Sequence, residues 1–180
     1  NDIEVLRPDL PRGRFRSVLF DFDGTLSLIR EGWPQVMIPM MIEVLQGTGT
    51  PETYEQLHQV VEDFVMRLNG RQTIYQMIQL AREVKQRGDE PVDALDYKHE
   101  SPRRLMQRIQ ARLDALANRR ATADEWTVPG SHALLDNLRQ RGVALYLASG
   151  TDIAYVRKEA ELLGLSDYFG EHIYGALDDY

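Results

Sequence analysis

The sequence predicts an α/β fold interrupted by a long all-helical insertion. Short β-rich apolar runs lie near both ends of the chain, and amphipathic helical segments alternate with them toward the C-terminus. About a hundred residues between these parts show helical periodicity only. We expect the α/β part to comprise residues 1–28 and 125–180, and the helical part residues 29–124. With 180 residues, 43% of them hydrophobic, the chain is large enough to bury a core.

Three segments are predicted strands. Residues 16–20 read "RSVLF" and residues 143–149 read "VALYLAS", which are apolar runs typical of parallel strands that are buried on both faces. Residues 172–176, "HIYGA", form a third strand of the same kind.

Two predicted helices alternate with the last two strands. The first opens at Ser131, a residue type that caps helices, carries three leucines on one face and ends at Gly142. The second starts near Thr151 and stops at Gly164. The C-terminal part therefore has the order helix, strand, helix, strand.

The middle of the chain is predicted to be all-helical. A start signal at Thr50-Pro51 precedes one amphipathic segment, and two more segments follow it. Residues 85–104 are charged and broken by prolines, which predicts a mobile loop between two of the helices. The apolar positions at helical spacing are Leu57, Val60, Val61, Phe64, Val65, Leu68, Ile74, Met77, Ile78, Ala81, Val84, Leu105, Ile109, Leu113 and Leu116.

Composition excludes several classes of partner and site. The formal net charge of −7 disfavours nonspecific binding to nucleic acid phosphates or to anionic lipid. The chain has no cysteine, so any metal must be held by oxygen or imidazole ligands. No apolar stretch is long enough to span a membrane and no secretory signal opens the chain, so we expect a cytoplasmic protein. Its oligomeric state stays open.

Two aspartates follow the first predicted strand. Because side chains alternate along a strand, Asp21 and Asp23 share one side and emerge at the carboxyl end, where open α/β sheets bind ligands. Gly24 permits a sharp turn there, and Thr25 adds a hydroxyl and a backbone amide suited to an anion. Two close carboxylates are unfavourable unless they share a proton or a cation lies between them.

This pair suits phosphoryl transfer with Mg²⁺. The Asp21 carboxylate and the Asp23 carbonyl could supply two oxygen ligands, with water and substrate phosphate supplying others. Asp21 could then attack phosphorus and form an aspartyl-phosphate. Asp23, protonated at first, could donate a proton to the leaving oxygen and later accept one from water.

The motif "DFDGT" at residues 21–25 resembles the first motif of the haloacid dehalogenase-like (HAD) hydrolases. "LYLASGT" resembles the second motif, which implies that Ser149 and Gly150 bind phosphate. The resemblance further implies a Rossmann-like three-layer core and an inserted helical cap that selects the substrate.

The third and fourth motifs of that family are not recognisable. Lys158 comes too early for the third, and Asp178 and Asp179 follow the last strand too closely for the fourth. We therefore expect the C-terminal part of the core to be missing from this chain.

Several other charged and aromatic residues have both a functional and a simpler explanation. Arg30 and Trp33 follow the first motif and could hold a second anionic group of the substrate. Arg104, Arg108 and Arg112 form a basic stripe that is more simply a solvated helix face than an RNA-binding surface.

Three functions fit the sequence. The first is a magnesium-dependent phosphatase that hydrolyses a small phosphorylated metabolite. A phosphomutase of the same family would use the same two aspartates. A noncatalytic HAD-like binding or regulatory fragment is the alternative from a different class.

Overall fold

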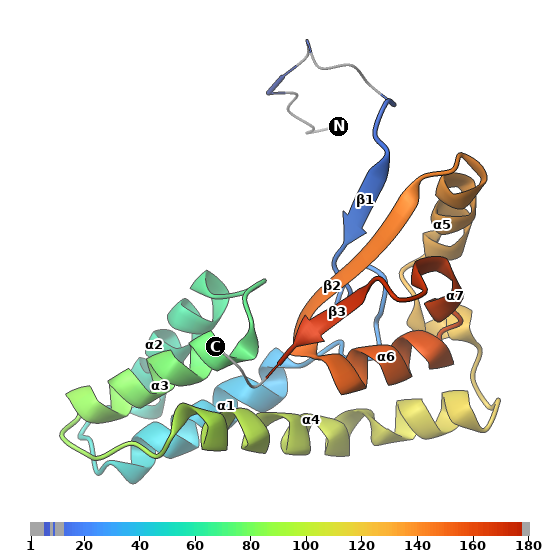
Figure 1. Ribbon diagram of the computed structural model, residues 1–180. Coiled ribbons are helices and arrows are strands. Elements are labelled where there is room, and N and C mark those ends of the chain that lie inside the picture. The colour runs from blue at the N-terminus through green and yellow to red at the C-terminus, as the bar shows by residue number, and fades with distance from the viewer. Residues whose placement is uncertain (1–5, 8, 10–12, 178–180) are drawn as a thin grey trace.

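A computed structural model describes residues 6, 7, 9 and 13–177. Its three strands form one parallel sheet in the order β1-β2-β3, which confirms the predicted α/β class (Figure 1). The sequence located all three strands, but the second continues three residues beyond its predicted end. The strands are β1 (Ser17–Phe20), β2 (Ala144–Asp152) and β3 (Ile173–Ala176). Asp178 and Asp179 lie outside the described residues.

The helices that alternate with these strands are α5 (Ser131–Gln140), α6 (Ile153–Leu162) and the short α7 (Ser166–Phe169). Ser131 does not cap α5 as predicted. Gly130 precedes the helix with a φ of 87°, and the Ser131 hydroxyl instead donates a hydrogen bond to the Val128 carbonyl at 2.7 Å. Gly142 and Gly164 follow α5 and α6 with positive φ, as the predicted stops require.

The middle of the chain is helical, as predicted, but two boundaries differ. The second helix begins at Tyr54, because Thr53 and Gln56 form a capping box just before it. Residues 94–104 are helical rather than a loop, since Asp93 caps the last long helix by accepting a hydrogen bond from the Leu95 amide. These elements are α1 (Pro34–Gly47), α2 (Tyr54–Arg67), α3 (Thr73–Gln86), α4 (Ala94–Ala117) and the 3₁₀ helix η1 (Ala123–Trp126).

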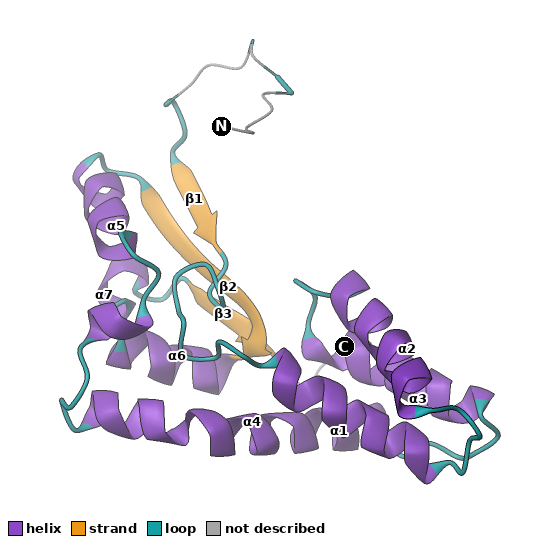
Figure 2. Cartoon of the chain, turned by 180° about the vertical axis from the view of Figure 1, so that it is seen from behind, coloured by secondary structure: helices purple, strands orange, loops and turns teal. Residues whose placement is uncertain are grey.

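Two hydrophobic clusters stabilise the molecule, and α4 takes part in both. One cluster joins the sheet to α5, α6 and α7 and includes Leu105 and Ile109 from α4. The other joins α1, α2 and α3, with Tyr97 of α4 packed against it. Trp33 packs against both clusters. Helix α4 runs along α1 at one end and along α6 at the other; Figure 2 shows it passing behind α1 and below α6.

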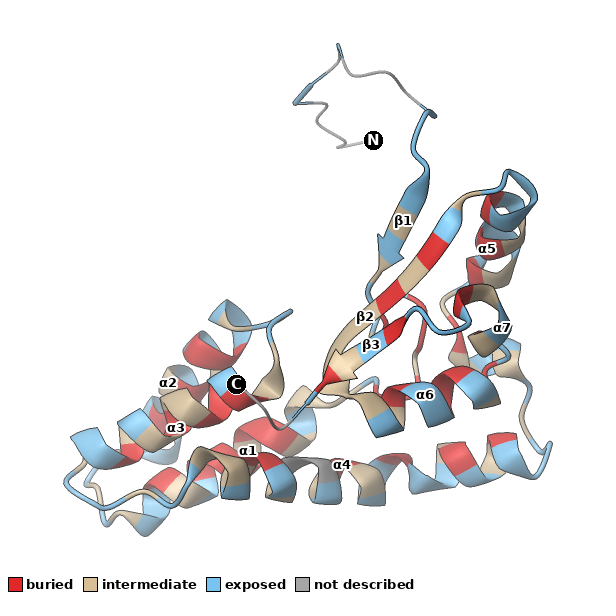
Figure 3. Ribbon diagram, in the orientation of Figure 1, coloured by how far each residue is buried: buried red, intermediate tan, exposed pale blue. Residues whose placement is uncertain are grey.

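The sheet is buried on one face among the described residues. Leu147 and Ile173 point into the cluster with α5 and α6, whereas Leu19 and Tyr174 on the other face are 66% and 51% exposed (Figure 3). The expectation that these strands are buried on both faces is therefore wrong for this part of the chain. Because no described helix covers the second face, its apolar side chains remain in solvent.

The chain enters and leaves the helical part at adjacent points. The Leu28 amide donates to the Trp126 carbonyl at 2.8 Å, and the Val128 amide donates to the Leu26 carbonyl at 3.0 Å. The division of the chain near residues 28 and 125 stays a prediction. In the part of the chain that the structure describes, no helix has the length and apolar character needed to cross a membrane.

Candidate active site

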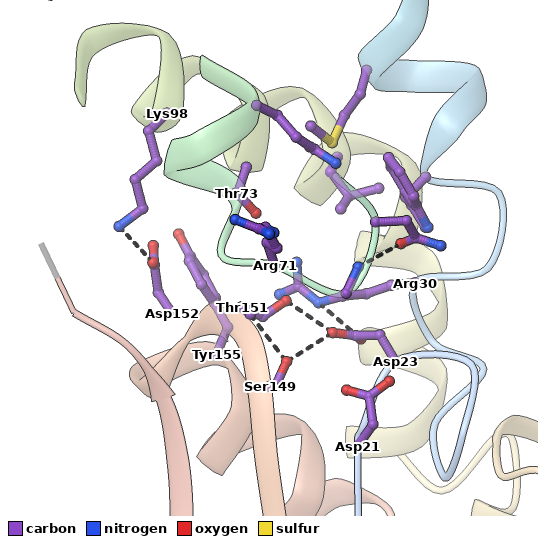
Figure 4. A pocket seen from close by; sticks show the side chains of 17 residues that line it. Asp21, Asp23, Arg30, Arg71, Thr73, Lys98, Ser149, Thr151, Asp152 and Tyr155 are labelled. Carbon is purple, nitrogen blue, oxygen red and sulfur yellow. Dashed lines mark hydrogen bonds and ion pairs between the residues drawn. The ribbon is translucent and has the colours of Figure 1, made fainter. Parts of the chain in front are cut away.

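A pocket of about 140 Å³ lies between the carboxyl ends of β1 and β2 and the helical part of the chain. Asp21 and Asp23 line it from the segment after β1, and Ser149 and Thr151 from the end of β2 (Figure 4). The helical part closes the opposite side with residues of the α2–α3 connection and with Lys98 of α4. The small volume favours a small ligand over a macromolecule.

A tight turn after β1 presents the two aspartates to this pocket. The fully buried Phe22 anchors the turn, since its carbonyl accepts hydrogen bonds from the amides of Thr25, Leu26 and Ser27. Gly24 adopts a φ of 76°, which favours glycine. The sequence predicted that the Thr25 amide would face an anion. It instead donates its hydrogen bond to the Phe22 carbonyl within the turn. Gly24 and Thr25 are outside the pocket lining.

Asp23 is the more buried of the two carboxylates. Its Oδ2 accepts hydrogen bonds from the Ser149 hydroxyl at 3.1 Å and from the Thr151 hydroxyl at 2.9 Å. Its Oδ1 is buried without a hydrogen-bond partner and lies 3.8 Å from Nε of Arg30. Burial raises the pKa of Asp23, and the Arg30 charge and the two hydroxyls oppose that rise. The site therefore favours a protonated Asp23 more than water does.

Asp21 has a different environment. Its side chain lines the pocket, the residue is exposed, and its Oδ2 accepts a hydrogen bond from the Thr25 hydroxyl at 3.3 Å. The two acids, two residues apart, therefore differ in their exposure to solvent and in their hydrogen-bond partners.

Ser149 and Gly150 come from an irregular part of β2. The pairing of β2 with β3 shifts register between Ala148 and Asp152, which frees the intervening backbone from the sheet ladder. The Ser149 hydroxyl donates to Asp23 and accepts a hydrogen bond from the Thr151 amide at 3.0 Å. A β-carbon on Gly150 would lie only 2.7 Å from the Arg71 carbonyl oxygen, so glycine allows the α2–α3 connection to approach this loop.

Arg30 lines the pocket, but it is buried and already paired. It donates to Glu159 of α6 at 2.7 and 3.1 Å, and the two residues are only 6% and 1% exposed. The Tyr155 ring lies 5.3 Å below its guanidinium carbon. Burial raises the pKa of Glu159, and the Arg30 charge opposes that rise. Arg30 is thus held between Glu159 and Asp23.

Sequence reasoning missed Glu159. Its position three residues after Val156 and one before Ala160 places it on the buried face of α6, and an acid on an apolar face was the available signal. It also missed Lys98, which pairs with Asp152 at 2.8 Å, because the segment around Lys98 was expected to be a loop. Trp33 does line the pocket, beside Met37.

Two of the three arginines in the α4 stripe make structural contacts, whereas Arg108 is exposed, as expected of a solvated face. Arg104 pairs with Glu43 of α1 at 2.7 Å. Arg112 donates to the carbonyls of Ile29 and Glu31 at 2.6 and 2.9 Å and lies over the Trp126 ring. Arg104 therefore joins α4 to α1, and Arg112 joins α4 to residues 29–31, which lead into the helical part.

Oxygen donors at the pocket suit a small hard cation only in part. Among the described residues, no group of three or more acidic or histidine side chains is arranged to hold a metal ion. Asp21 offers an accessible carboxylate, and Mg²⁺ often binds through one or two carboxylates together with water and substrate phosphate. The residues present therefore fit part of a magnesium site.

A sequence model described as haloacid dehalogenase-like hydrolase matches residues 15–180. That range takes in every strand and helix of the sheet part and of the helical part. No curated protein sequence matches the chain.

Solved structures share the fold at low sequence identity. A predicted phosphoglycolate phosphatase from Haemophilus somnus aligns with a TM-score of 0.53 and 17% identity, over 94% of this chain and 67% of that one. A family IA, variant 3 HAD hydrolase from Entamoeba histolytica aligns with a TM-score of 0.55 and 19% identity, over 92% and 63%. The chain thus spans roughly two thirds of each, a likeness that concerns the fold alone.

Proposed function

Because the chain belongs to the haloacid dehalogenase-like hydrolases, we propose that it forms the nucleophile and acid/base part of a magnesium-dependent phosphomonoester hydrolase. The observation that carries this proposal is the unequal environment of the two aspartates. Asp21 is exposed to the pocket, whereas Asp23 is only partly exposed and accepts hydrogen bonds from two hydroxyls. The substrate class is a small phosphorylated metabolite, as the size of the pocket favours.

Asp21 is the nucleophile in this proposal. One of its carboxylate oxygens attacks phosphorus, a new bond forms between that oxygen and phosphorus, and the bond from phosphorus to the ester oxygen breaks. The Thr25 hydroxyl, which donates to Asp21 Oδ2, leaves the other oxygen free to react.

Asp23 moves the proton in both halves of the reaction. In the first it protonates the departing alkoxide, so the alcohol leaves neutral. In the second it accepts a proton from the water that attacks the aspartyl-phosphate, and the bond from phosphorus to Asp21 breaks to release phosphate. Thr151 keeps the Asp23 side chain aimed into the pocket during both steps.

Mg²⁺ would be held by the Asp21 carboxylate and the Asp23 backbone carbonyl, and when bound it would neutralise the charge that otherwise repels a phosphate ester from Asp21. Ser149 and Gly150 would contact the phosphate. The Ser149 hydroxyl would then turn its one proton from Asp23 to a phosphate oxygen, while the Thr151 hydroxyl keeps its hydrogen bond to Asp23. The proposed cytoplasmic location fits this chemistry but stays a prediction.

Hydrolysis of a generic aryl phosphate tests the proposal, with Mg²⁺ or with a chelator, using this chain and any longer natural form of it. We expect magnesium-dependent release of phosphate, which Asp21→Asn reduces below detection. Asp63→Asn is the matched control. Asp63 is an exposed carboxylate on α2, outside the pocket lining, and its hydrogen-bond partner among the described residues is Gln59. Undiminished hydrolysis by Asp21→Asn would refute the nucleophile, and inactivity of every form would favour the noncatalytic alternative.

A further inference from the structure

Three cations line the pocket, and they are not equivalent. Arg30 is paired with Glu159 at 2.7 Å, and Lys98 with Asp152 at 2.8 Å. Arg71, in the α2–α3 connection, forms no side-chain hydrogen bond or ion pair within the part of the chain that the structure describes. The sequence suggested Arg30 for a second anionic group of the substrate, but Glu159 and Asp23 already occupy its guanidinium.

The backbone of Arg71 packs against Gly150, in the segment at the end of β2 that we propose binds phosphate. A β-carbon on Gly150 would lie 2.7 Å from the Arg71 carbonyl oxygen, so the two backbones are in close contact. The Arg71 amide donates to the Leu68 carbonyl at 3.1 Å. The Asn69 side chain accepts a hydrogen bond from the Gly70 amide within the same turn. In Figure 4 the Arg71 side chain lies beyond Thr151, across the pocket from Asp21. The fixed backbone therefore places an exposed guanidinium, which has no side-chain partner among the described residues, across the pocket from the proposed nucleophile.

We propose that Arg71 binds a second anionic group of the substrate, so that the preferred substrates are small phosphate esters carrying a carboxylate or another phosphate a few atoms from the reacting phosphorus. This inference rests on the proposed hydrolase function and names its substrate class. A guanidinium suits either anion because its fork of N–H donors matches two oxygens at once. Phosphate esters with an uncharged second group, here called neutral esters in contrast to the anionic esters with a charged one, would leave Arg71 unpaired and would bind less tightly.

The discriminating experiment uses esters that differ only in the second group. Phosphoglycolate carries a carboxylate, 2-hydroxyethyl phosphate carries a neutral alcohol in its place, and ethylene glycol bisphosphate carries a second phosphate. We expect kcat/KM to be about 10- to 100-fold higher for at least one anionic ester than for the neutral one, mainly through KM, as a charge-assisted hydrogen bond would give. The two anionic esters distinguish a carboxylate from a phosphate.

Variants of the α2–α3 connection then assign the preference to one side chain. Arg71→Gln should lower the anionic-to-neutral ratio by about 10- to 100-fold, and Arg71→Lys, which keeps the charge but loses the fork, should lower it less. Arg67→Gln removes a second exposed arginine, from the end of α2 and outside the pocket lining, and should leave the ratio unchanged. Circular dichroism of each variant checks that it is folded.

Two results would overturn the inference while leaving the hydrolase function intact. One is a parent enzyme that hydrolyses the neutral ester as well as both anionic esters. The other is a folded Arg71→Gln variant whose preference equals that of the parent, which would make Arg71 a solvated side chain. Inactivity of the parent enzyme on all three esters and on the aryl phosphate would instead refute the proposed function itself.

Discussion

The partly buried carboxyl of Asp23 should make the protein less stable as pH rises. Burial raises its pKa above the ordinary value of 3.8, so its stabilising contribution is complete below that value and is lost as pH rises through the folded-state pKa. Asp23→Asn cannot ionise. We expect its midpoint of thermal unfolding to rise relative to the parent between pH 4 and pH 8, measured with a chelator present.

The same variant should be nearly inactive, with kcat about 10²- to 10⁴-fold lower, because an amide cannot donate or accept the proton. A protein made more stable and less active by one substitution would show that the site retains a costly charge for its chemistry. A stability difference that does not change with pH would contradict the assigned direction of the pKa shift.

Adding a single methyl group at Gly150 should also lower activity. Gly150→Ala would place a methyl group 2.7 Å from the Arg71 carbonyl oxygen, and because that neighbour is backbone, the α2–α3 connection must move away. We expect at least about a 10-fold loss of kcat/KM, since small misplacements near a reaction centre are costly. Steady-state kinetics and a thermal melt measure the effect.

Gly47→Ala is the matched control for this substitution. Gly47 lies at the end of α1, and no neighbouring atom is within 4 Å of the place that a β-carbon would take, so alanine should leave activity unchanged. Equal kinetics for Gly150→Ala and the parent would show that the connection adjusts freely.

At the residue scale, sequence reasoning found the groups that adjoin strand ends. Asp21, Asp23 and Ser149 could be placed because strand periodicity fixes side-chain direction and parallel strands end at one edge. Glu159 and Arg71 could not, because their positions depend on how α6 and the α2–α3 connection pack against those ends. The acid on the apolar face of α6 marked Glu159 as unusual, but the contacts of both residues are set by tertiary structure.

At the scale of elements, Arg112 joins helix α4 to the segment that precedes α1. Arg112 satisfies the carbonyls of Ile29 and Glu31, and its loss would leave both without this donor. We expect Arg112→Met to lower the free energy of unfolding by about 1–3 kcal/mol. Arg103→Met is the control on the same helix, because Arg103 is exposed and its ion pair among the described residues is with Glu100, so its effect should be much smaller than that of Arg112→Met. Urea denaturation measures both, and equal effects would contradict a structural role for Arg112.

The sequence predicted the helices but not the start of α4. Charged residues and two prolines between positions 85 and 104 suggested a loop, yet Asp93 caps the helix and Tyr97 packs on the neighbouring cluster. Burial of apolar surface and a good cap together outweigh a weak local propensity. Two arginines of the stripe were misjudged for the same reason, since their partners come from α1 and from residues 29–31.

The molecule as a whole should unfold in one step. Because α4 contributes to both hydrophobic clusters and Trp33 packs against both, neither cluster can be exposed without disturbing the other. We expect the urea transitions followed by far-ultraviolet circular dichroism and by tryptophan fluorescence to coincide. Leu57→Ala in one cluster and Leu135→Ala in the other should each move both probes together by about 2–5 kcal/mol. Separate transitions would show two independent folding units.

The contact between Ser149 and Asp23 can form only late in translation, because the two residues are 126 positions apart in the sequence. At translation rates of about 5–20 residues per second, roughly 6 to 25 s pass between the emergence of the first partner and that of the second. During that interval β1 has no strand beside it, and the intervening helices, whose contacts are largely local, can form first and draw the ends together. A ribosome-bound chain would therefore form its helices before Asp23 and Ser149 can come into contact.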